Sequence, residues 1–330
     1  MARDQALIDT LKACSDPVRA DVLRLLARDS FGVLELAHIL ELPQPALSHH
    51  LKVLARAGLV ATRRDGNSIF YRRSARTDDA VLEPLTCSVF EALDRLKISR
   101  SKSARLRQVH RQRAERSRAF FAERASDFEA QRALICEPDV YLGAVQRRLP
   151  RRRRRALDVG PGGGEALVML AERFEHVVGI DNSPAMLSRA RRALVPDHGE
   201  GDAQTAAQRC ARNVVLKHGE FLALRKERFD AIVLAMVLHH APSPAAFFAH
   251  AARLLAPAGR VIVVELVRHD QEWARDACGD LWLGFEPNEL VDWARAAELT
   301  PAAPEYLAQR NGFRVQIHHF DRLSDRGLPR

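Results

Sequence analysis

The sequence predicts two domains of different fold class: an N-terminal helical domain that ends in a β-hairpin, and a C-terminal α/β domain with a doubly wound sheet. The 330 residues correspond to roughly two domains of about 150 residues each. Apolar residues recur at helical spacing up to residue 98, whereas short apolar strands alternate with helices after residue 155. The net charge is +1 over residues 1–98, +11 over 99–155 and −3 over 156–330. We therefore expect a domain at 1–98, a basic helical linker at 99–155 and a second domain at 156–330.

The first part of the chain reads as four helices. Asp16 and Pro17 suit the N-cap and first helical position of the second helix. A third helix at 33–40 ends at a bend over 41–43, and a fourth begins near Gln44. Three apolar residues share one face of this fourth helix at i, i+4 and i+7 spacing: Leu47, Leu51 and Leu54. The pattern predicts a helix, a tight turn and a second helix.

A hairpin follows the fourth helix, which Gly58 ends. Residues 59–64 and 68–73 read as strands around the turn Asp65-Gly66-Asn67. Together these elements predict a winged helix-turn-helix, which reads double-stranded operator DNA in the major groove. The face of the fourth helix opposite its leucines offers Gln44, Ser48, His49 and Lys52 to base edges and phosphates. The wing offers Arg63, Arg64, Arg72 and Arg73 for phosphate or minor-groove contacts.

Residues 5–96 resemble the ArsR/SmtB-type transcriptional regulators. The stretches that carry the resemblance are SDPVR at 15–19, LSHHLKVL at 47–54, AGLV at 57–60 and RDGN at 64–67. The resemblance implies a homodimer in which the first helix and the helix at 81–96 pair across a two-fold axis. Many members sense metals through cysteines in the third helix or a histidine-rich set in the last helix, and this sequence has neither. We therefore predict no metal site and a signal that enters elsewhere.

The basic segment at 99–155 admits two interpretations. Residues 117–132 look helical, with an apolar stripe of Phe120, Phe121, Ala125 and Phe128. Residues 151–155 are five consecutive arginines. They either form a solvated approach to the next strand or contact DNA phosphates.

The second domain begins with a glycine-rich loop. We place strands at 156–159, 176–180, 214–218, 229–234 and 260–266, with a late strand near 312–319. Asp158, Gly160, Gly162 and Gly164 follow the first strand and precede a helix, so the backbone there can turn sharply and approach a ligand. Asp181 ends the second strand, where a carboxylate accepts hydrogen bonds from ribose hydroxyls. The pattern predicts a nucleoside site.

Residues 117–319 resemble the class I S-adenosylmethionine-dependent methyltransferases, which have a Rossmann-like fold. The matching stretches are 157–164, 178–187, 229–240 and 254–260. The resemblance implies that the ligand is S-adenosylmethionine or S-adenosylhomocysteine. It places Asp158 and Gly160 by the methionine moiety, Asp181 on the ribose and Glu220 on the adenine amino group. A dinucleotide remains an alternative, because NAD uses the same glycine pattern.

The remaining features carry less specific signals. His239 and His240 follow the fourth strand and face the ligand crevice, where they act structurally, contact a substrate or accept a proton from it. Five cysteines without CxxC spacing, Cys14, Cys87, Cys136, Cys210 and Cys278, favour neither disulfides nor a zinc site. The sequence shows neither a signal peptide nor an apolar run of the ~18 residues that a membrane span needs, so we expect a cytoplasmic protein.

Two functions agree with these patterns. The first is a DNA-binding transcriptional regulator whose methyltransferase-like domain senses an S-adenosyl ligand, with S-adenosylhomocysteine favoured as the effector. The second is an active methyltransferase that modifies a small-molecule acceptor and carries a regulatory winged helix. No catalytic residue can be assigned from the sequence, since methyl transfer needs mainly alignment of acceptor and methyl group.

Overall fold

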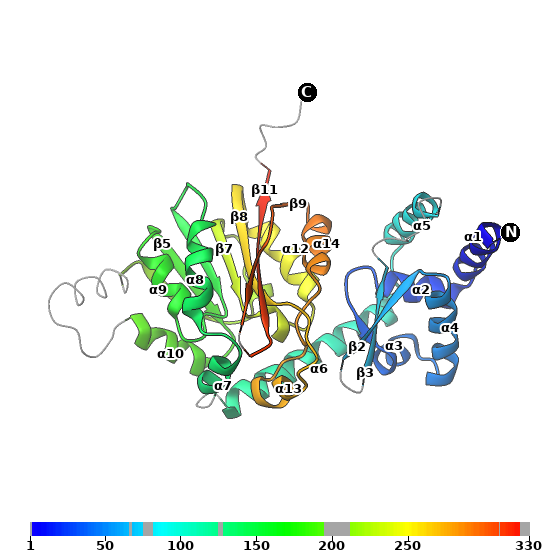
Figure 1. Ribbon diagram of the computed structural model, residues 1–330, viewed down its shortest axis with the longest axis horizontal. Helices are drawn as coiled ribbons and strands as arrows, with labels where there is room; N and C mark the ends of the chain where they lie inside the picture. Colours follow the sequence, from blue (N-terminus) through cyan, green and yellow to red (C-terminus); the bar gives the residue numbers. More distant parts are fainter. Residues whose placement is uncertain are drawn as a thin grey trace, which may run out of the picture. The chain divides into compact units, whose positions relative to one another are not determined.

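The computed structural model describes residues 2–65, 68–74, 82–124, 128–194, 212–309 and 311–323. The chain forms two compact units, residues 1–113 and residues 114–330 (Figure 1). Each unit has its own hydrophobic core.

The first unit is a winged helix-turn-helix, as the sequence predicts. Its helices are α1 (Ala2–Cys14), α2 (Pro17–Leu25), α3 (Val33–Leu40), α4 (Gln44–Arg56) and α5 (Glu83–Arg95). Its strands β1 (Phe31–Gly32), β2 (Val60–Asp65) and β3 (Ser68–Arg73) form an antiparallel sheet of order β1-β3-β2. The predicted leucine face of α4, formed by Leu47, Leu51 and Leu54, is fully buried in the core.

Local chemistry explains where these helices begin and end. The Asp16 carboxylate accepts a hydrogen bond from the backbone N–H of Arg19 at 2.9 Å, and Pro17 is the first residue of α2. Glu41 adopts a left-handed conformation with φ of 56° and ends α3, so the chain turns into α4. The predicted turn residues Gly66 and Asn67 lie outside the described residues, as do 75–81, which include the predicted start of the last helix.

The segment that we expected to be a linker divides between the two units. It forms α6 (Arg100–Arg124), α7 (Phe128–Ile135) and α8 (Pro138–Arg147). Residues of α6 up to Arg113 belong to the first unit, and the rest of α6 with α7 and α8 belongs to the second. Ala125, part of the predicted apolar stripe, lies outside the described residues.

The second unit is a doubly wound α/β domain. Parallel strands β6 (Val214–His218), β5 (His176–Asp181), β4 (Arg155–Val159), β7 (Phe229–Ala235) and β8 (Leu255–Leu266) lie side by side in this order. Antiparallel strands β11 (Arg314–Arg322), β10 (Glu305–Ala308) and β9 (Leu299–Pro301) extend the sheet beyond β8. The helices around it are α8, α9 (Glu165–Ala171), α10 (Pro184–Leu194), α12 (Pro244–Leu254) and α14 (Pro287–Ala296) (Figure 1).

The order of the parallel strands fixes where a ligand can bind. The chain moves from β4 outward to β5 and β6, then returns to β7 on the other side of β4. This reversal opens a crevice at the carboxyl ends of the strands, next to β4.

Among the described residues, no helix is long and apolar enough to cross a membrane.

Candidate functional site

The predicted DNA-reading residues of α4 lie on the outside of the first unit. Gln44, Ser48, His49 and Lys52 are all exposed, on the face opposite the buried leucines. The neighbouring His50 is half-buried, and its Nδ1 lies 3.6 Å from a carboxylate oxygen of Asp16. The four predicted residues therefore lie on the solvent-exposed face of α4.

The wing arginines differ from one another in their surroundings. Arg64 is exposed and Arg72 is half-exposed. Arg63 is buried. Arg73 donates hydrogen bonds to the Leu23 carbonyl and to the Asp94 carboxylate, at 2.6 and 3.0 Å, and its guanidinium lies over the Phe90 ring. Arg63 is thus little exposed, and the Arg73 side chain is held against α2 and α5, whereas Arg64 and Arg72 are the more exposed of the four predicted arginines.

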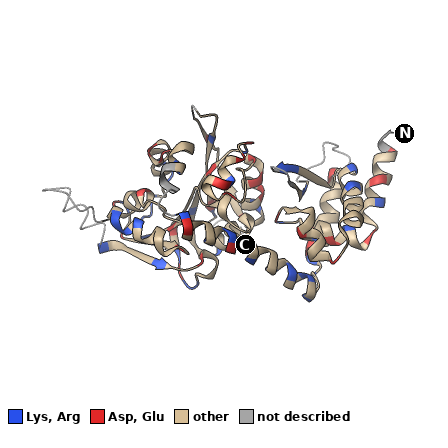
Figure 2. Ribbon diagram, turned by 90° about the horizontal axis from the view of Figure 1, so that it is seen from below, with Lys and Arg blue, Asp and Glu red and all other residues tan. Residues whose placement is uncertain are grey.

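The first half of α6 is bound to the winged-helix core. Arg113, only 5% exposed, donates hydrogen bonds to both Glu35 carboxylate oxygens at 2.8 and 2.6 Å and to the Ser30 carbonyl at 3.0 Å. Arg105 donates to the Ile39 carbonyl at 2.8 Å and pairs with Glu41 at 2.9 Å. Figure 2 shows how Lys and Arg residues are spread along α6. Several of them anchor this helix to α3 and to the residues that flank it.

A pocket opens in the second unit at the carboxyl ends of β4, β5, β6 and β7. Its free space, including the part open to solvent, is about 890 Å³. The predicted residues Gly160, Gly162, Asp181 and Glu220 line it. The lining residues that we did not predict include Ala114, Ser117, Phe121, Arg132, Ile180, Met186, Phe221, Val237, Ala241, Pro242 and Phe247.

The three loop glycines that we predicted as ligand contacts differ in their structural roles. Gly160 and Gly162 line the pocket with φ of 66° and 53°, a conformation that disfavours a side chain. Gly164 is not a pocket residue: a Cβ there would lie 2.8 Å from the Cβ of Ala193. Gly164 therefore permits close packing of α9 against α10, and we correct its predicted role from ligand contact to helix packing.

Asp158 lies just behind the glycine loop and is almost fully buried. Within the described residues, its Oδ2 atom has no hydrogen-bond partner. Burial raises the pKa of Asp158 to about 7, and the nearby carboxylates of Glu165 and Asp181 add to this effect. A buried acceptor of this kind is suited to a donor group that a ligand brings.

Asp181 and Glu220 place carboxylates on the pocket wall. One oxygen of Asp181 accepts a hydrogen bond from the backbone N–H of Ser183 at 2.8 Å, which orients the carboxylate. Burial raises the pKa of Asp181 to about 6, and backbone N–H groups oppose this shift. Glu220 accepts a hydrogen bond from the Asn182 side chain at 3.2 Å and pairs with Arg118 at 3.5 Å.

The second half of α6 forms part of the pocket wall. Ala114, Ser117 and Phe121 face the pocket at spacings that put them on one side of a helix. The Phe121 ring packs edge-on against His240, with 4.9 Å between the ring centroids. From α7, Arg132 also lines the pocket and donates a hydrogen bond to Glu165 at 2.7 Å.

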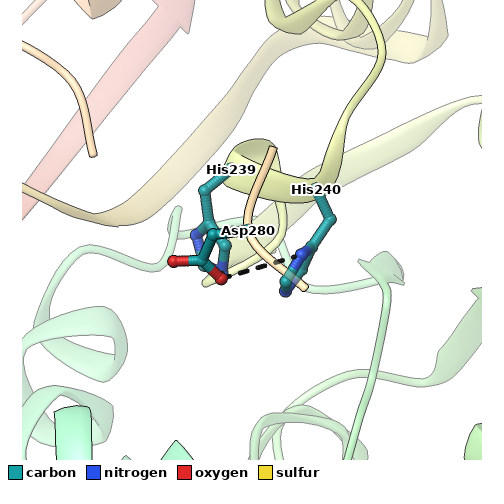
Figure 3. Close-up of side chains that lie close together, drawn as sticks. All are labelled: His239, His240 and Asp280. Carbon is teal, nitrogen blue, oxygen red and sulfur yellow. Dashed lines mark ion pairs between the residues drawn. The ribbon is translucent and has the colours of Figure 1, made fainter. Parts of the chain in front are cut away.

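His239 and His240 belong to the short 3₁₀ helix η2 (Leu238–His240) beside the pocket. The side chain of Asp280, from a later segment of the chain, lies close to both (Figure 3). The Nδ1 atom of His239 lies 2.9 Å from both oxygens of the buried Glu265. Burial by itself lowers the pKa of His239, but the carboxylates of Glu265 and Asp280 outweigh it and raise that pKa to about 9. Burial lowers the pKa of His240, and the charge on His239 lowers it further. Of the two, His240 lines the pocket.

The arginine run at 151–155 is largely paired within the second unit. Arg152 lies 3.2 Å from Asp230, Arg154 lies 3.8 Å from Glu175, and Arg155 lies 2.8 Å from Glu227. The backbone N–H groups of Arg154 and Arg155 also donate to Asp230, each at 3.0 Å. These contacts favour the interpretation that the run leads into β4 over the interpretation that it binds phosphates.

Fold and site together define a winged helix-turn-helix protein that carries a doubly wound domain with a glycine-lined pocket. The family model described as a methyltransferase domain matches residues 128–316. The model described as bacterial regulatory protein, arsR family, matches residues 16–62. The chain belongs to the methyltransferase-domain family, and it carries an ArsR-family helix-turn-helix ahead of that domain.

Individual relatives match one part of the chain or the other. The ubiquinone biosynthesis O-methyltransferase of Alkalilimnicola ehrlichii is 33% identical over 159 residues, which are 44% of this chain and 60% of that enzyme. An uncharacterized HTH-type transcriptional regulator of Methanocaldococcus jannaschii is 39% identical over 72 residues, 22% of this chain and 81% of that protein. Magnesium protoporphyrin IX methyltransferase of Synechocystis PCC 6803, with bound SAM, has a TM-score of 0.46 at 16% identity, over 64% of this chain and 97% of that chain. This chain thus spans less than two thirds of the first O-methyltransferases that it matches.

Proposed function

We propose that this protein is a DNA-binding transcriptional regulator whose methyltransferase domain binds an S-adenosyl nucleoside and communicates its presence to the winged helix-turn-helix. The observation that carries this proposal is helix α6. Arg105 and Arg113, on its first half, are hydrogen-bonded to the winged-helix unit. Ser117 and Phe121, on its second half, line the pocket. One continuous helix therefore belongs to the core of the first unit and to the pocket wall of the second.

The pocket residues fit an S-adenosyl nucleoside. The Asp181 carboxylate can accept hydrogen bonds from two ribose hydroxyls, and Ile180, Met186 and Phe221 offer apolar surface to a purine. The buried Oδ2 of Asp158 is an acceptor that suits an ammonium or amide donor. When bound, S-adenosylmethionine would supply an electrophilic methyl group, whereas S-adenosylhomocysteine has none to transfer.

The first unit supports double-stranded operator DNA as the macromolecular ligand, read by the exposed residues of α4. A homodimer is part of the proposal. Three large apolar side chains of α1 are exposed, Leu7, Ile8 and Leu11, at 40%, 43% and 51%. Their spacing places them on one side of the helix. Cover by the same helix of a second copy would remove this apolar surface from water.

The test is a titration of DNA with and without nucleoside. Duplexes selected from a random library by the purified protein serve as operator, and unselected duplexes serve as the comparison. A nucleoside can change operator affinity only if it binds the free and the DNA-bound protein differently. We expect a change of about fivefold or more, larger with S-adenosylhomocysteine than with S-adenosylmethionine. No change with either nucleoside, despite binding of both, would contradict the sensor function.

The variant Asp181→Ala locates the effect in the pocket. Loss of a charged hydrogen-bond partner should weaken nucleoside binding about ten- to hundredfold, measured by calorimetry. The effect of nucleoside on operator affinity should disappear at the same concentrations. Asp270→Ala, at an exposed aspartate that does not line the pocket, is the matched control and should behave as the wild type. A nucleoside effect that persists in Asp181→Ala would place the effector site elsewhere.

An active methyltransferase is the second candidate, and one observation favours it. The pocket continues beyond the glycine loop to Ala241, Pro242 and Phe247, where an acceptor has room beside the nucleoside. The relative from Alkalilimnicola ehrlichii is an O-methyltransferase by name, so phenols and catechols are the first acceptors to test. Transfer of a labelled methyl group to one of them, lost in Asp181→Ala, would establish the activity. Tight nucleoside binding without transfer would leave the sensor function alone.

A further inference from the structure

Three side chains beside the pocket bring potential metal-ligand atoms close together. His239, His240 and Asp280 are all buried, and one potential ligand atom from each lies within 4.8 Å of the other two (Figure 3). We propose that these three side chains bind one divalent first-row transition metal ion. This site is separate from the residues that we assign to the nucleoside.

The distances are close to those of a coordination sphere. Nε2 of His239 lies 3.8 Å from Oδ1 of Asp280, and Nδ1 of His240 lies 4.0 Å from the same oxygen. Nδ1 of His240 also lies 3.3 Å from the Gly279 carbonyl oxygen, a contact that a bound ion would replace. Ligands of a tetrahedral ion with bonds of about 2.1 Å are separated by about 3.4 Å, so each of these two pairs exceeds this separation by only about half an ångström. Small side-chain rotations within one rotamer would close the difference.

The surroundings orient the ligands. Nδ1–H of His239 donates to Glu265, whose side chain is completely buried, so in the neutral imidazole that binds an ion the lone pair is on Nε2, the atom nearer Asp280. A metal-binding imidazole usually donates its other ring N–H to a carboxylate or carbonyl, which fixes the orientation of the ring. Glu265 is itself held by the backbone N–H groups of Leu238 and Leu266, at 2.9 and 3.0 Å.

Backbone hydrogen bonds hold the two segments of the site together. The His239 carbonyl accepts from the N–H groups of Leu281 and Trp282, at 2.9 and 3.1 Å. The indole N–H of Trp282 donates to the Ala241 carbonyl at 2.9 Å. Asp280, the residue before Leu281, is thereby fixed beside η2 although 40 positions separate it from His240. The ligands are therefore arranged before an ion binds, which lowers the cost of binding.

Charge balance points to a divalent cation. Among His239, His240, Asp280 and Glu265, two side chains are carboxylates, and both are almost fully buried. One imidazolium would balance only one of the two negative charges, whereas an ion of charge +2 balances both and leaves the imidazoles neutral. Buried net charge is costly, so the doubly charged ion is the better complement to this set.

The ligand types select the class of metal. Two imidazoles and one carboxylate suit Zn²⁺, Fe²⁺, Co²⁺ or Ni²⁺, whereas Mg²⁺ and Ca²⁺ prefer oxygen ligands alone. Three protein ligands also leave at least one position for another molecule, as in catalytic metal sites. Because His240 lines the pocket, the open position is expected on that side.

The experiment uses the full chain without an affinity tag, stripped of metal by a chelator. Titration with Zn²⁺ by calorimetry should show one equivalent per chain, and Zn²⁺ should raise the melting temperature. X-ray absorption of the Zn²⁺-loaded wild type should count two imidazole ligands and no sulfur. Nonsaturating binding, a thiolate ligand, or fewer than two imidazoles would overturn the proposal without any variant.

Variants then test each ligand. Asp280→Asn and His240→Gln keep side-chain size and should each weaken Zn²⁺ binding at least tenfold, and Glu265→Gln should weaken it about ten- to hundredfold. His250→Gln changes another buried histidine of the same unit, and His176→Gln changes an exposed one; both should bind as the wild type does. Near-ultraviolet circular dichroism identifies the variants that remain folded. Folded Asp280→Asn and His240→Gln proteins with unchanged affinity would refute the assignment.

Discussion

The two units present their candidate sites in opposite ways. On α4 the candidate residues are those that the core does not use: the leucines point inward, and Ser48 and His49 are left on the surface. In the second unit, Asp158 behind the glycine loop is buried and Asp181 on the pocket wall is half-buried, so both carboxylates at these strand ends are shielded from water. The residues of the α4 site therefore have little effect on the free energy of unfolding, whereas the buried polar groups of the second site lower it.

This difference predicts how each unit responds to mutation. Changes on the surface of α4 should alter binding and leave stability intact, whereas changes of buried polar groups should alter both. Helix α6 is the exception in the first unit, because its polar residues Arg105 and Arg113 are anchors and not surface groups.

The largest effect is expected from Arg113→Gln. Removing the guanidinium leaves the Glu35 carboxylate without its bidentate partner, which should lower the free energy of unfolding of the first unit by about 3 kcal/mol. All three tryptophans lie in the second unit. Urea unfolding followed by circular dichroism should therefore show an early transition that tryptophan fluorescence does not report.

Arg116→Gln is the matched control, three positions further along α6 and exposed. It should unfold as the wild type does, within about 0.5 kcal/mol. Equal stability of the two variants would show that the buried pair of Arg113 and Glu35 does not anchor α6.

The next effect concerns DNA specificity. Ser48→Ala combined with His49→Ala should reduce the preference for selected operator over random duplex by about 1–3 kcal/mol for each base that the helix no longer reads. Arg64→Ala should instead weaken binding to all duplexes and reduce the slope of log affinity against log salt by about 1. Melting temperatures should stay at the wild-type value in both cases. Equal losses of affinity for operator and for random duplex in the double variant would contradict the assignment of α4 as the helix that reads base edges.

Much of this fold could be predicted, because local patterns determine it. The leucines of α4 repeat with the helical period, the Asp16-Pro17 cap has a local hydrogen bond, and the apolar strands β4 to β8 are separated by helices of ordinary length. The prediction of a linker at 99–155 did not indicate how that segment packs against the two units. Its high charge suggested a basic linker, but Arg105, Arg113 and Arg132 pair with carboxylates far away in the sequence.

The same limit applies to the sites. The glycine loop and Asp181 are adjacent to strand ends, so sequence order alone brings them together. The residues missed by sequence analysis come from distant segments: Phe121 from α6, Arg132 from α7 and Asp280 from the loop after α13 (Trp273–Cys278). One available signal was overlooked, the carboxylate of Glu265 within the otherwise apolar run 261–266 of β8. A buried charge at such a place needs a partner, and His239 is that partner.

An effect of about tenfold is expected from pH. Because Asp158 has a pKa of about 7 in the fold, well above its ordinary value of about 4, its protonated form is favoured in the ligand-free protein. A donor on the nucleoside favours the ionised form, so affinity should fall about tenfold per pH unit below pH 7 and stay level above it. Calorimetry between pH 5.5 and pH 8.5, values chosen to bracket a pKa of about 7, measures this.

Asp158→Asn supplies the control, because it cannot ionise. Its affinity for the nucleoside should be lower than that of the wild type at pH 8, a value about one unit above the pKa of Asp158, and nearly independent of pH.

The free energy of unfolding of the wild type should fall as pH rises, whereas its affinity for the nucleoside rises. The raised pKa of Asp158 contributes stability that is fully present below the unfolded pKa and is lost as pH rises through the folded value of about 7. Asparagine avoids that loss, so a variant that is less stable than the wild type above pH 7 would contradict the buried, ligand-seeking role of Asp158.

The smallest effect is expected from the arginine run. Arg152, Arg154 and Arg155 already pair with carboxylates of the second unit, so their charges are partly neutralised within the fold. Replacing these three with glutamine should leave the salt dependence of DNA binding unchanged, although three phosphate contacts would reduce the log-log slope by about 3. Stability should decrease by less than about 1 kcal/mol for each partly exposed pair. A reduced slope would mean that DNA competes successfully for these side chains, and the basic segment would then belong to the DNA-binding surface together with α4 and the wing.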